Sequence, residues 1–319
     1  MPRPQRPRRT VLAVPGSSRR MLEKAPGLDV DAVFLDLEDA VAPDAKAGAR
    51  DLVVAALHEG DWSGKAVTVR VNDATRPGAH RDVVEIVSRA GDRIDAIMLP
   101  KVEHIAHVHW IDVLLGQLER EHDLEPGRIG LELIIEGPRG LADVQRIAAA
   151  SPRLDTLVYG PGDFTSAMRI PTLTVGDTSI GGHDPIDPVF SQLAVAARAN
   201  DAQVIDGPYA GIHDFDGLRR AAEHTRAFGF DGKWVLHPAQ IEVVNEVFTP
   251  DPAAVERAER ILAAYAHHTS AAGGTRGAVL FEGEMIDEAT HRMARTIAAA
   301  GHRAGLGRGR DDDGDGAGA

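Results

Sequence analysis

The chain has no cysteine among its 319 residues, and this absence excludes several kinds of site. Disulfide bonds, thiolate metal centres and cysteine nucleophiles are all ruled out. No apolar run approaches the roughly 18 residues of a membrane span. Only residues 11–14 separate the basic start from Pro15 and Gly16, which is too short for the apolar region of a signal peptide. We therefore expect a cytoplasmic protein whose residues 1–9 form a disordered basic tip.

Basic residues are fewer than acidic ones, with 35 lysines and arginines against 48 aspartates and glutamates. The formal net charge is −13, which argues against wrapping nucleic acid and against adhesion to an anionic membrane. We expect neither as a partner, and an anionic substrate would need a local basic pocket set against the overall charge. Residues 304–319 are rich in glycine and aspartate, and we interpret them as a disordered tail.

Short β-rich runs alternate with longer segments whose apolar residues recur with the helical period. Eight such runs occur, at residues 10–14, 32–37, 66–71, 96–100, 131–136, 156–160, 203–206 and 233–237. Strands that are apolar throughout, each followed by an amphipathic helix, predict a parallel sheet covered by helices. Eight units favour a closed α/β structure, the (β/α)₈ TIM barrel, over an open sheet. The turn after the first run also lacks the GxGxxG pattern of a dinucleotide site.

The chain continues beyond the eighth unit with elements that a barrel wall does not need. Residues 277–287 indicate a small hairpin around Glu282 and Gly283, and a helix follows. We assign residues 10–268 to a TIM-barrel catalytic domain and residues 269–303 to a C-terminal helical and hairpin arm.

Polar residues at the strand ends are the candidates for function, because barrel active sites lie at the carboxyl ends of the strands. These ends carry Asp36, Glu38, Asp39, Arg70, Asn72, Lys101, Glu103, Glu136, Asp163, Asp206 and His237. Charged groups beside buried strands are costly unless they are paired or ligated. The set therefore contains ion pairs, metal ligands or both.

Glu136 and Asp163 follow neighbouring strands and stand at matching heights. Two carboxylates without cysteine or clustered histidine suit Mg²⁺, with Mn²⁺ as a substitute, and water or substrate oxygens would complete the shell. Alternatively, the two carboxylates form ion pairs with Arg70, Arg139 or Lys101. Spacing alone does not separate these interpretations.

Three basic residues have both a functional and a structural interpretation. Arg70 could hold a substrate carboxylate or stabilise a developing enolate oxygen, and a salt bridge to Asp36 or Glu38 is compatible with either role. Arg20 and Lys24, one helical turn apart, could meet phosphates near the barrel mouth or could form a solvated helix face.

Nine stretches of the sequence carry a family resemblance. They are VLAVPGSSRRMLEKA, FLDLEDAVAPDAK, VTVRVN, MLPKVE, LIIEGPRGL, GPGDF, IDGPYAGIHDFDG, GFDGKWVLHPAQIEVVNEVFTP and RGAVLFEGEMIDEAT. In this order, over about residues 9–300, they resemble the citrate lyase β-subunit-like proteins of the HpcH/HpaI aldolase superfamily, and within them the malyl-CoA/β-methylmalyl-CoA lyases. The resemblance implies Mg²⁺-dependent, reversible aldol-type cleavage of malyl-, β-methylmalyl- or citramalyl-CoA. The products would be glyoxylate or pyruvate and acetyl- or propionyl-CoA.

The resemblance also implies roles for individual residues. Glu136 and Asp163 would hold the Mg²⁺, Arg70 and Glu136 would contact substrate, and segment 285–287 would close a neighbouring subunit's site in a homotrimer or homohexamer. Asp287 would serve there as acid and base. Further contacts to substrate or CoA are implied for Arg20, Lys24, Gly162, Val235 and Leu236, with Asp36, Glu38 and Asp39 in support.

Some features depart from the family pattern. Where such lyases commonly have a threonine after the metal-binding glutamate, this chain has Gly137, followed by Pro138 and Arg139, and the segment after the sixth strand is shorter. Both departures lie near the expected oxoacid pocket, so the sequence does not identify the acyl group of the substrate. A thioesterase using the same metal and a citrate lyase β-like subunit acting on citryl-CoA are the alternatives. The lyase mechanism needs no Schiff base, so we interpret Lys101 as structural.

Overall fold

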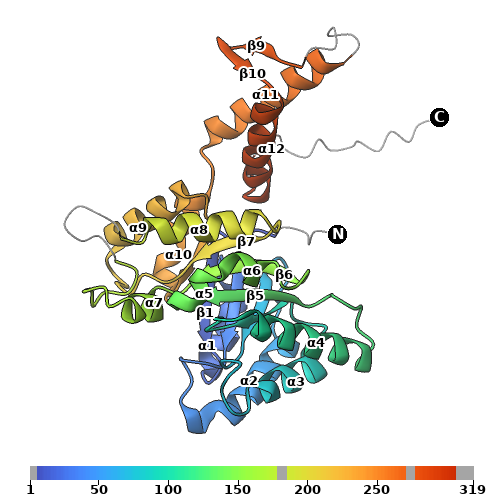
Figure 1. Ribbon diagram of the computed structural model, residues 1–319, viewed down its shortest axis with the longest axis vertical. Coiled ribbons are helices and arrows are strands. Elements are labelled where there is room, and N and C mark those ends of the chain that lie inside the picture. The colour runs from blue at the N-terminus through green and yellow to red at the C-terminus, as the bar shows by residue number, and fades with distance from the viewer. Residues whose placement is uncertain (1–5, 178–184, 271–276, 307–319) are drawn as a thin grey trace. The chain divides into compact units, whose positions relative to one another are not determined.

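The computed structural model describes residues 6–177, 185–270 and 277–306, and eight parallel strands in it close into a barrel (Figure 1). The strands are β1 (Thr10–Pro15), β2 (Ala32–Asp36), β3 (Ala66–Arg70), β4 (Ala96–Leu99), β5 (Gly130–Ile135), β6 (Leu154–Tyr159), β7 (Gln203–Asp206) and β8 (Gly232–Val235). Each strand pairs with the next, and β8 pairs with β1 to close the ring. The eight predicted strands and the TIM-barrel fold are therefore confirmed.

Helices connect the strands and cover the outside of the barrel (Figure 1). They are α1 (Arg19–Lys24), α2 (Lys46–Glu59), α3 (Ala79–Ala90), α4 (Ile105–Glu121), α5 (Pro138–Ala142), α6 (Val144–Ala148), α7 (Pro161–Ala167), α8 (Asp187–Arg198), α9 (Phe215–Ala227) and α10 (Ile241–Phe248). Short 3₁₀ turns occupy Ala25–Gly27, Pro43–Ala45 and Pro238–Gln240. Among the helices of the described residues, none is both long enough and apolar enough to cross a membrane.

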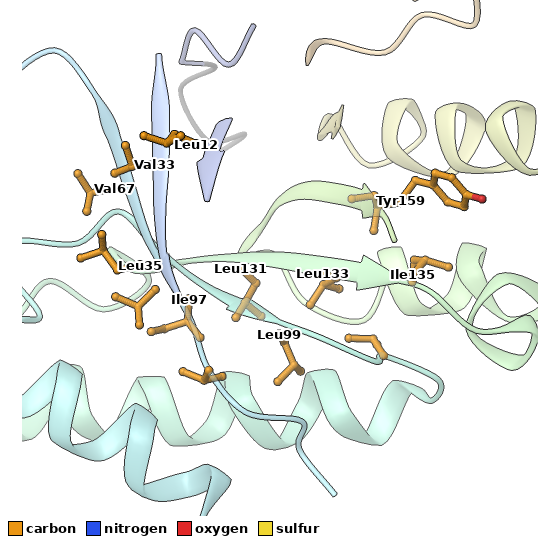
Figure 2. Packing of buried hydrophobic residues seen from close by; sticks show 14 of the residues in the cluster. Leu12, Val33, Leu35, Val67, Ile97, Leu99, Leu131, Leu133, Ile135 and Tyr159 are labelled. Carbon is orange, nitrogen blue, oxygen red and sulfur yellow. The ribbon is translucent and has the colours of Figure 1, made fainter. Parts of the chain in front are cut away.

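Side chains alternate between the two faces of each strand, and this alternation builds two separate cores. The barrel interior contains Val11, Ala32, Phe34, Ala66, Met98, Ile134, Val158, Ile205 and Trp234. The other face packs against the helices and includes Leu12, Val33, Val67, Ile97 and Leu131 (Figure 2). Asp36, Arg70 and Glu136 each lie an even number of residues beyond an inward-facing side chain. The same alternation therefore directs these three charged groups inward at the carboxyl end of the barrel.

Arg8 corrects the prediction of a disordered tip over residues 1–9. Arg8 is only 2% exposed, and its guanidinium donates to Asp155 at 2.8 Å and to Glu132 at 3.0 Å. The prediction was wrong here because a basic composition does not reveal that the amino ends of the strands present buried carboxylates. Residues 1–5 lie outside the described residues.

Replacing Arg8 with methionine is expected to lower the free energy of unfolding by about 3–5 kcal/mol, because Glu132 and Asp155 would be left buried without a counter-charge. Urea unfolding followed by circular dichroism measures the change. The matched control is Arg6→Met, since Arg6 pairs with Asp95 at 2.8 Å but is about half exposed. That variant should lose less than about 1 kcal/mol. Equal losses in the two variants would contradict the structural role of Arg8.

The described residues from Thr249 onwards form a second compact unit. It contains α11 (Pro252–Thr269), the antiparallel hairpin of β9 (Val279–Phe281) and β10 (Glu284–Ile286), and α12 (Glu288–Arg303). Its small core consists of Ala258, Ile261, Tyr265, Val279, Ile286, Ala294 and Ala298. The predicted helical and hairpin arm is thus present, but the boundary differs from the predicted one at residue 268, because α11 buries its apolar face with the hairpin and α12. Residues 307–319 of the predicted tail lie outside the described residues.

Candidate active site

Arg70 lies at the end of β3 and is fixed by Asp36, its register partner on β2. The guanidinium Nε and Nη2 donate to the Asp36 carboxylate at 2.7 and 2.6 Å, and Nη1 lies 3.2 Å from Glu38. The guanidinium also sits over the rings of Phe34 and Trp234, 5.3 and 5.6 Å from their centroids. The predicted salt bridges are therefore present, and they hold the guanidinium in one orientation.

Burial and charge act in opposite directions on this group. Burial alone would lower the pKa of Arg70, but the hydrogen bonds and charge of Asp36, and the charge of Glu38, outweigh it and raise the pKa. For Glu38, burial raises the pKa, although the charges of Arg70 and Lys101 pull it down. Arg70 thus stays a cation at any working pH, and its charge and that of Lys101 partly offset the effect of burial on the pKa of Glu38.

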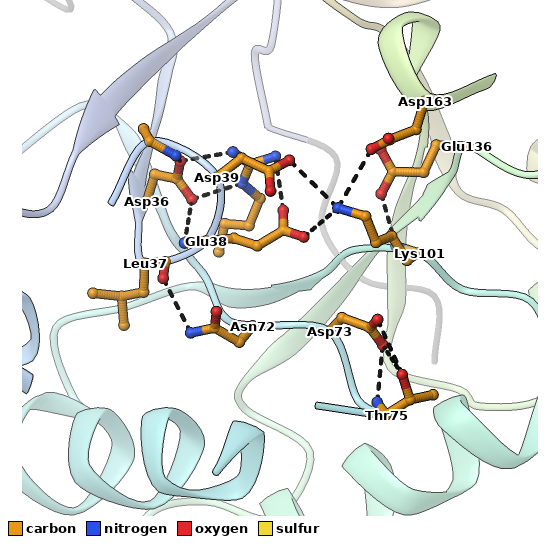
Figure 3. A network of polar contacts seen from close by, with 12 residues as sticks. Asp36, Leu37, Glu38, Asp39, Asn72, Asp73, Thr75, Lys101, Glu136 and Asp163 are labelled. Carbon is orange, nitrogen blue, oxygen red and sulfur yellow. Dashed lines mark hydrogen bonds and ion pairs between the residues drawn. The ribbon is translucent and has the colours of Figure 1, made fainter. Parts of the chain in front are cut away.

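Lys101 joins the carboxylates at the mouth of the barrel (Figure 3). Its backbone is left-handed, with φ of 52°, and its N–H donates to Glu136 Oε1 at 2.7 Å. Its ammonium lies 2.5 Å from Glu38 Oε1, 3.3 Å from Asp163 Oδ2 and 3.4 Å from Asp39. A non-glycine residue in this conformation is strained, and such strain persists only where the surroundings enforce it. Lys101 therefore contacts both carboxylates of the predicted metal pair.

Glu136 and Asp163 lie together on one side of the Lys101 ammonium (Figure 3). Glu136 is 8% exposed, and burial raises its pKa to about 8, although the charge and the N–H of Lys101 lower it. The side chain of Asp163 is about half exposed, at 49%. Over residues 6–177, 185–270 and 277–306, no three histidine, aspartate or glutamate side chains gather into a metal cluster. The protein's share of a cation site here would be these two carboxylates, which is typical of Mg²⁺.

The turn after β6 brings Asp163 to Glu136. A Cβ at Gly160 would lie 2.5 Å from Glu136 Cβ and 2.6 Å from its Oε2, so only glycine lets the two segments approach this closely. Gly160 is also the N-cap of α7, and Pro161 occupies the first helical position, where a missing N–H costs nothing. The GPGDF stretch thus places Asp163 in the first turn of a helix that lies directly against Glu136.

A cavity of about 560 Å³ opens beside Lys101, over the ends of β2, β3 and β4. Its lining includes Glu38, Asp39, Lys46, Arg76, Arg81 and Lys101. Arg76 and Arg81 form no ion pair with any other residue that the structure describes. The cavity therefore offers an anionic substrate two cationic side chains that have no carboxylate partner in the described residues, in a lining that also contains carboxylates.

The other residues predicted to contact substrate come from β1, β6 and β8 and their loops. Arg20 and Lys24 are both exposed on α1, and neither pairs with another described residue. The side chain of Val235 is buried in the core, so only its backbone could meet a ligand, while Leu236 is half-buried. Gly162 lies in the first turn of α7, and a Cβ there would meet only the methyl groups of Val175, at 3.8 Å.

Asp287 belongs to the second unit, where it is the N-cap of α12. One carboxylate oxygen accepts the N–H of Ala289 at 2.9 Å and of Thr290 at 3.0 Å. The hydrogen bond from the Thr290 N–H is the main cause of a lowered pKa of Asp287, which is exposed. In the chain by itself Asp287 is therefore an ionised carboxylate, and its predicted role as an acid requires a less polar environment.

Two lysines make contacts near the candidate site that the strand-end pattern does not predict. Lys101 is interpreted from the sequence as structural, yet it contacts both Glu136 and Asp163. Lys233 in β8 is 1% exposed and pairs with Asp206. A signal for Lys233 was present, because a lysine inside an apolar strand must have a buried partner.

The chain matches proteins of known name over nearly its whole length. The model of the HpcH/HpaI aldolase/citrate lyase family matches residues 9–238. An L-malyl-CoA/β-methylmalyl-CoA lyase of Cereibacter sphaeroides is 38% identical over 309 residues, covering 93% of this chain and 95% of that protein. A (3S)-malyl-CoA thioesterase of the same organism is 37% identical over 299 residues, covering 92% and 95%. The crystal structure of protein CitE from Mycobacterium tuberculosis, in complex with magnesium, acetoacetate and coenzyme A, has a TM-score of 0.70 and 26% identity, covering 92% and 97%.

Proposed function

We propose that this chain, which belongs to the HpcH/HpaI aldolase/citrate lyase family and is a carbon–carbon lyase, cleaves a malyl-CoA-like thioester with the help of Mg²⁺. The substrate would be malyl-, β-methylmalyl- or citramalyl-CoA, and the products a 2-oxoacid and acetyl- or propionyl-CoA. One observation carries the proposal: Glu136 and Asp163 both contact Lys101 at the barrel mouth, and Lys101 shares Glu38 with the fixed Arg70, in a chain 38% identical to a lyase of this kind.

Glu136 and Asp163 would hold the metal, and their surroundings fit a cation. Glu136 Oε1 accepts the Lys101 N–H, while Oε2 has no hydrogen-bond donor among the described residues. The position already attracts positive charge, since the ammonium of Lys101 lies 3.3 Å from Asp163. When bound, Mg²⁺ would act as a Lewis acid toward the carboxylate and hydroxyl oxygens of the substrate. Magnesium in the related CitE complex supports this choice.

Arg70 and Asp287 would perform the remaining steps. The substrate hydroxyl would lose its proton to solvent, from which Asp287 would later regain one. The bond from the hydroxyl carbon to the carbon beside the thioester would break, and its electron pair would move into an enolate of acetyl- or propionyl-CoA. Arg70 would stabilise the enolate oxygen with N–H groups that Asp36 and Glu38 leave free. Asp287 would return a proton to the enolate carbon in cleavage and remove it in condensation.

Substrate binding would use the residues around the mouth. Arg20 and Lys24, exposed and unpaired within the described chain, would attract the phosphates of CoA, and the backbone of Val235 and Leu236 would contact its body. Gly162 would admit the oxoacid. Asp36, Glu38 and Asp39 would act in support, because they orient Arg70 and Lys101.

Gly137 lies beside the expected oxoacid pocket, where many such lyases have a threonine. A Cβ at this position would lie 2.7 Å from Glu103 Oε1, so the carboxylate of Glu103 takes the place of a side chain there. The pocket wall beside Glu136 thus differs from that of lyases with a threonine. This difference affects which oxoacid fits and leaves the chemistry of cleavage unchanged.

The second unit would complete the site of another copy of this chain, in a homotrimer or homohexamer. Leu280 and Met285 are cross-strand partners on the outer face of the hairpin, and each is 76% exposed. On α12, Met293 and Ile297 are exposed one helical turn apart. Exposed apolar groups beside Asp287 are typical of a surface that another chain covers. Burial of Asp287 by that chain would also raise the pKa of its carboxyl group toward the working pH, where it could act as a general acid.

The experiment that tests the reaction separates carbon–carbon cleavage from hydrolysis. Purified protein and Mg²⁺ are incubated with malyl-, β-methylmalyl-, citramalyl- and citryl-CoA, and oxoacid and free thiol are measured separately. Oxoacid without thiol is expected. Thiol without oxoacid would establish the thioesterase instead, a candidate that the 37% identical thioesterase relative supports. Cleavage of citryl-CoA alone would favour a citrate lyase β-like protein.

The affinity for Mn²⁺, used as a spectroscopic substitute for Mg²⁺, is expected to rise with pH and to level off above about pH 8. Burial raises the pKa of Glu136 to about 8, so below this pH a cation must displace a proton. One displaced proton corresponds to about a tenfold gain in affinity per pH unit between pH 6 and 8. Mn²⁺ titrations followed by electron paramagnetic resonance at several pH values measure it. A flat profile over this range would contradict the assignment of Glu136 as a ligand.

A further inference from the structure

A buried ion pair lies behind the candidate site, between the barrel wall and the helices. Asp206 and Lys233 are register partners on β7 and β8 and are 3% and 1% exposed. Their neighbours Ile205 and Trp234 face the barrel interior, so the alternation along each strand directs the two charges outward. A buried ion pair is often no more stable than apolar side chains of the same volume. Stability therefore does not account for this pair, and its other contacts indicate what it does.

Lys233 holds the first residue after β7. Its ammonium contacts the Asp206 carboxylate and donates to the carbonyl oxygen of Gly207 at 2.9 Å. Burial raises the pKa of Asp206, although the charge of Lys233 and hydrogen bonds that include the Gly207 N–H lower it. The peptide groups of Gly207 are thus fixed by the ion pair at the carboxyl end of the barrel.

Gly207 in turn lies against the helix that carries Asp163. A Cβ at Gly207 would be 2.2 Å from Pro161 Cδ and 2.5 Å from the carbonyl oxygen of Tyr159. Pro161 is the first residue of α7, and Asp163 lies two residues further in the same turn. The preceding residue, Gly160, packs on Glu136. The first turn of α7 is therefore enclosed between Glu136 on one side and Gly207 on the other.

The loop beyond Gly207 is held from its far side as well. The amide of Gln240 donates to the Tyr209 carbonyl at 3.0 Å, and the Ala210 N–H donates to the Val175 carbonyl at 2.9 Å. Because this loop is fixed at three places, a methyl group added to Gly207 would displace Pro161 and not the loop. The displacement would be transmitted to Asp163 through a single helical turn.

We propose that Lys233 and Gly207 are positioning residues for the metal site: the ion pair fixes Gly207, and Gly207 sets the place of the α7 turn that directs Asp163 toward Glu136. The inference rests on the proposed function, because its consequence is the affinity of the Glu136–Asp163 pair for a divalent cation. It gives a role to a buried lysine that does not touch the reacting atoms.

Mn²⁺ binding to the full chain, measured by electron paramagnetic resonance, tests the proposal without any assay of turnover. Gly207→Ala is expected to weaken Mn²⁺ binding by about tenfold or more, the usual effect of disturbing the residues that orient metal ligands. The matched control is Gly91→Ala at the end of α3, where a Cβ would lie 2.5 Å from the Val87 carbonyl oxygen and 2.8 Å from Leu124. That variant suffers a similar clash away from the site and should bind Mn²⁺ as the wild type does.

A second variant covers the case in which Gly207→Ala does not fold. The double variant Lys233→Met and Asp206→Leu removes both charges and keeps similar volume, a change that folded proteins commonly accept. It releases the Gly207 carbonyl and is expected to weaken Mn²⁺ binding several-fold, and the urea midpoint shows that the variant is folded under the conditions of the titration. Unchanged Mn²⁺ affinity in this variant, or equal losses in Gly207→Ala and Gly91→Ala, would overturn the positioning role.

The proposed metal site is tested separately in the same titrations. Wild-type protein should bind Mn²⁺ and Glu136→Gln should not. If both results are obtained and the Gly207 and Lys233 variants bind normally, only the positioning role fails. If the wild type does not bind Mn²⁺, the metal site and the positioning role fail together.

Discussion

An Asp287→Asn variant is expected to lose a factor of about 100 to 10,000 in kcat while it binds Mn²⁺ like the wild type. Asparagine keeps a side-chain oxygen for the N–H groups of Ala289 and Thr290, and it is among the best N-cap residues, so α12 should keep its start. Only the ability to carry a proton is removed. Steady-state kinetics with malyl-CoA, and Mn²⁺ titration of the same samples, measure the two quantities.

Asp287→Ser is the comparison, because serine also caps a helix and also lacks the acid. The two variants should lose the same activity. Wild-type turnover in either variant would exclude Asp287 as the acid and base, and a parallel loss of Mn²⁺ binding would place it at the metal instead.

Mixing Asp287→Asn protein with Glu136→Gln protein tests whether subunits share a site. If segment 285–287 of one copy closes the barrel of another, some mixed sites contain both wild-type residues, and activity should return after subunit exchange. Mixtures kept under conditions that prevent exchange are the control. Inactive mixtures after verified exchange would show that each chain supplies its own residues or that the arm has another role.

Glu136→Gln is expected to weaken Mn²⁺ binding by about 100-fold or more and to abolish turnover. Replacing a residue that only orients a metal ligand can lower metal affinity by up to about 100-fold, and loss of a ligand itself should cost at least as much. Glutamine has the same shape and still accepts the Lys101 N–H that now lies 2.7 Å from Oε1. Burial raises the pKa of Glu136 to about 8, so the neutral amide removes a charge that is costly to bury above that pH. The metal-free variant should therefore be at least as stable as the wild type at pH 9.

Glu103→Gln is the matched control for this loss. Glu103 follows β4, and its carboxylate fills the space where a Cβ of residue 137 would lie. It is not one of the two proposed ligands. Its replacement should leave Mn²⁺ affinity nearly unchanged. If Glu136→Gln binds Mn²⁺ normally, Glu136 is simply an ion-pair partner of Lys101, the alternative that its spacing leaves open.

Much of the candidate site could be predicted from local pattern. Asp36, Arg70 and Glu136 continue the two-residue alternation of buried strands, which directs them into the mouth of any barrel these strands form. The GPGDF turn adds Asp163 one strand along. These positions follow from periodicity and from the ends of strands, both of which depend on neighbours in the sequence.

Asp206 shows the limit of that approach. It stands at a strand end like Glu136, yet it is one residue out of phase with Ile205, so it faces the helices. The strand-end pattern groups the two carboxylates together, whereas the face of the strand separates them. Their environments differ for that reason: Glu136 lies at the mouth, and Asp206 is paired with Lys233 in the outer layer.

Hydrophobic periodicity and short motifs are local properties, so the barrel, the strand ends and the family could all be predicted from the sequence. Which charges are partners depended on the three-dimensional fold. Arg8 is paired with Asp155 across 147 positions of sequence, and Lys101 reaches both Glu136 and Asp163. Electrostatic interactions depend on distance and burial in space, and folding brings together charged groups whose separation along the chain gives no indication that they will be in contact.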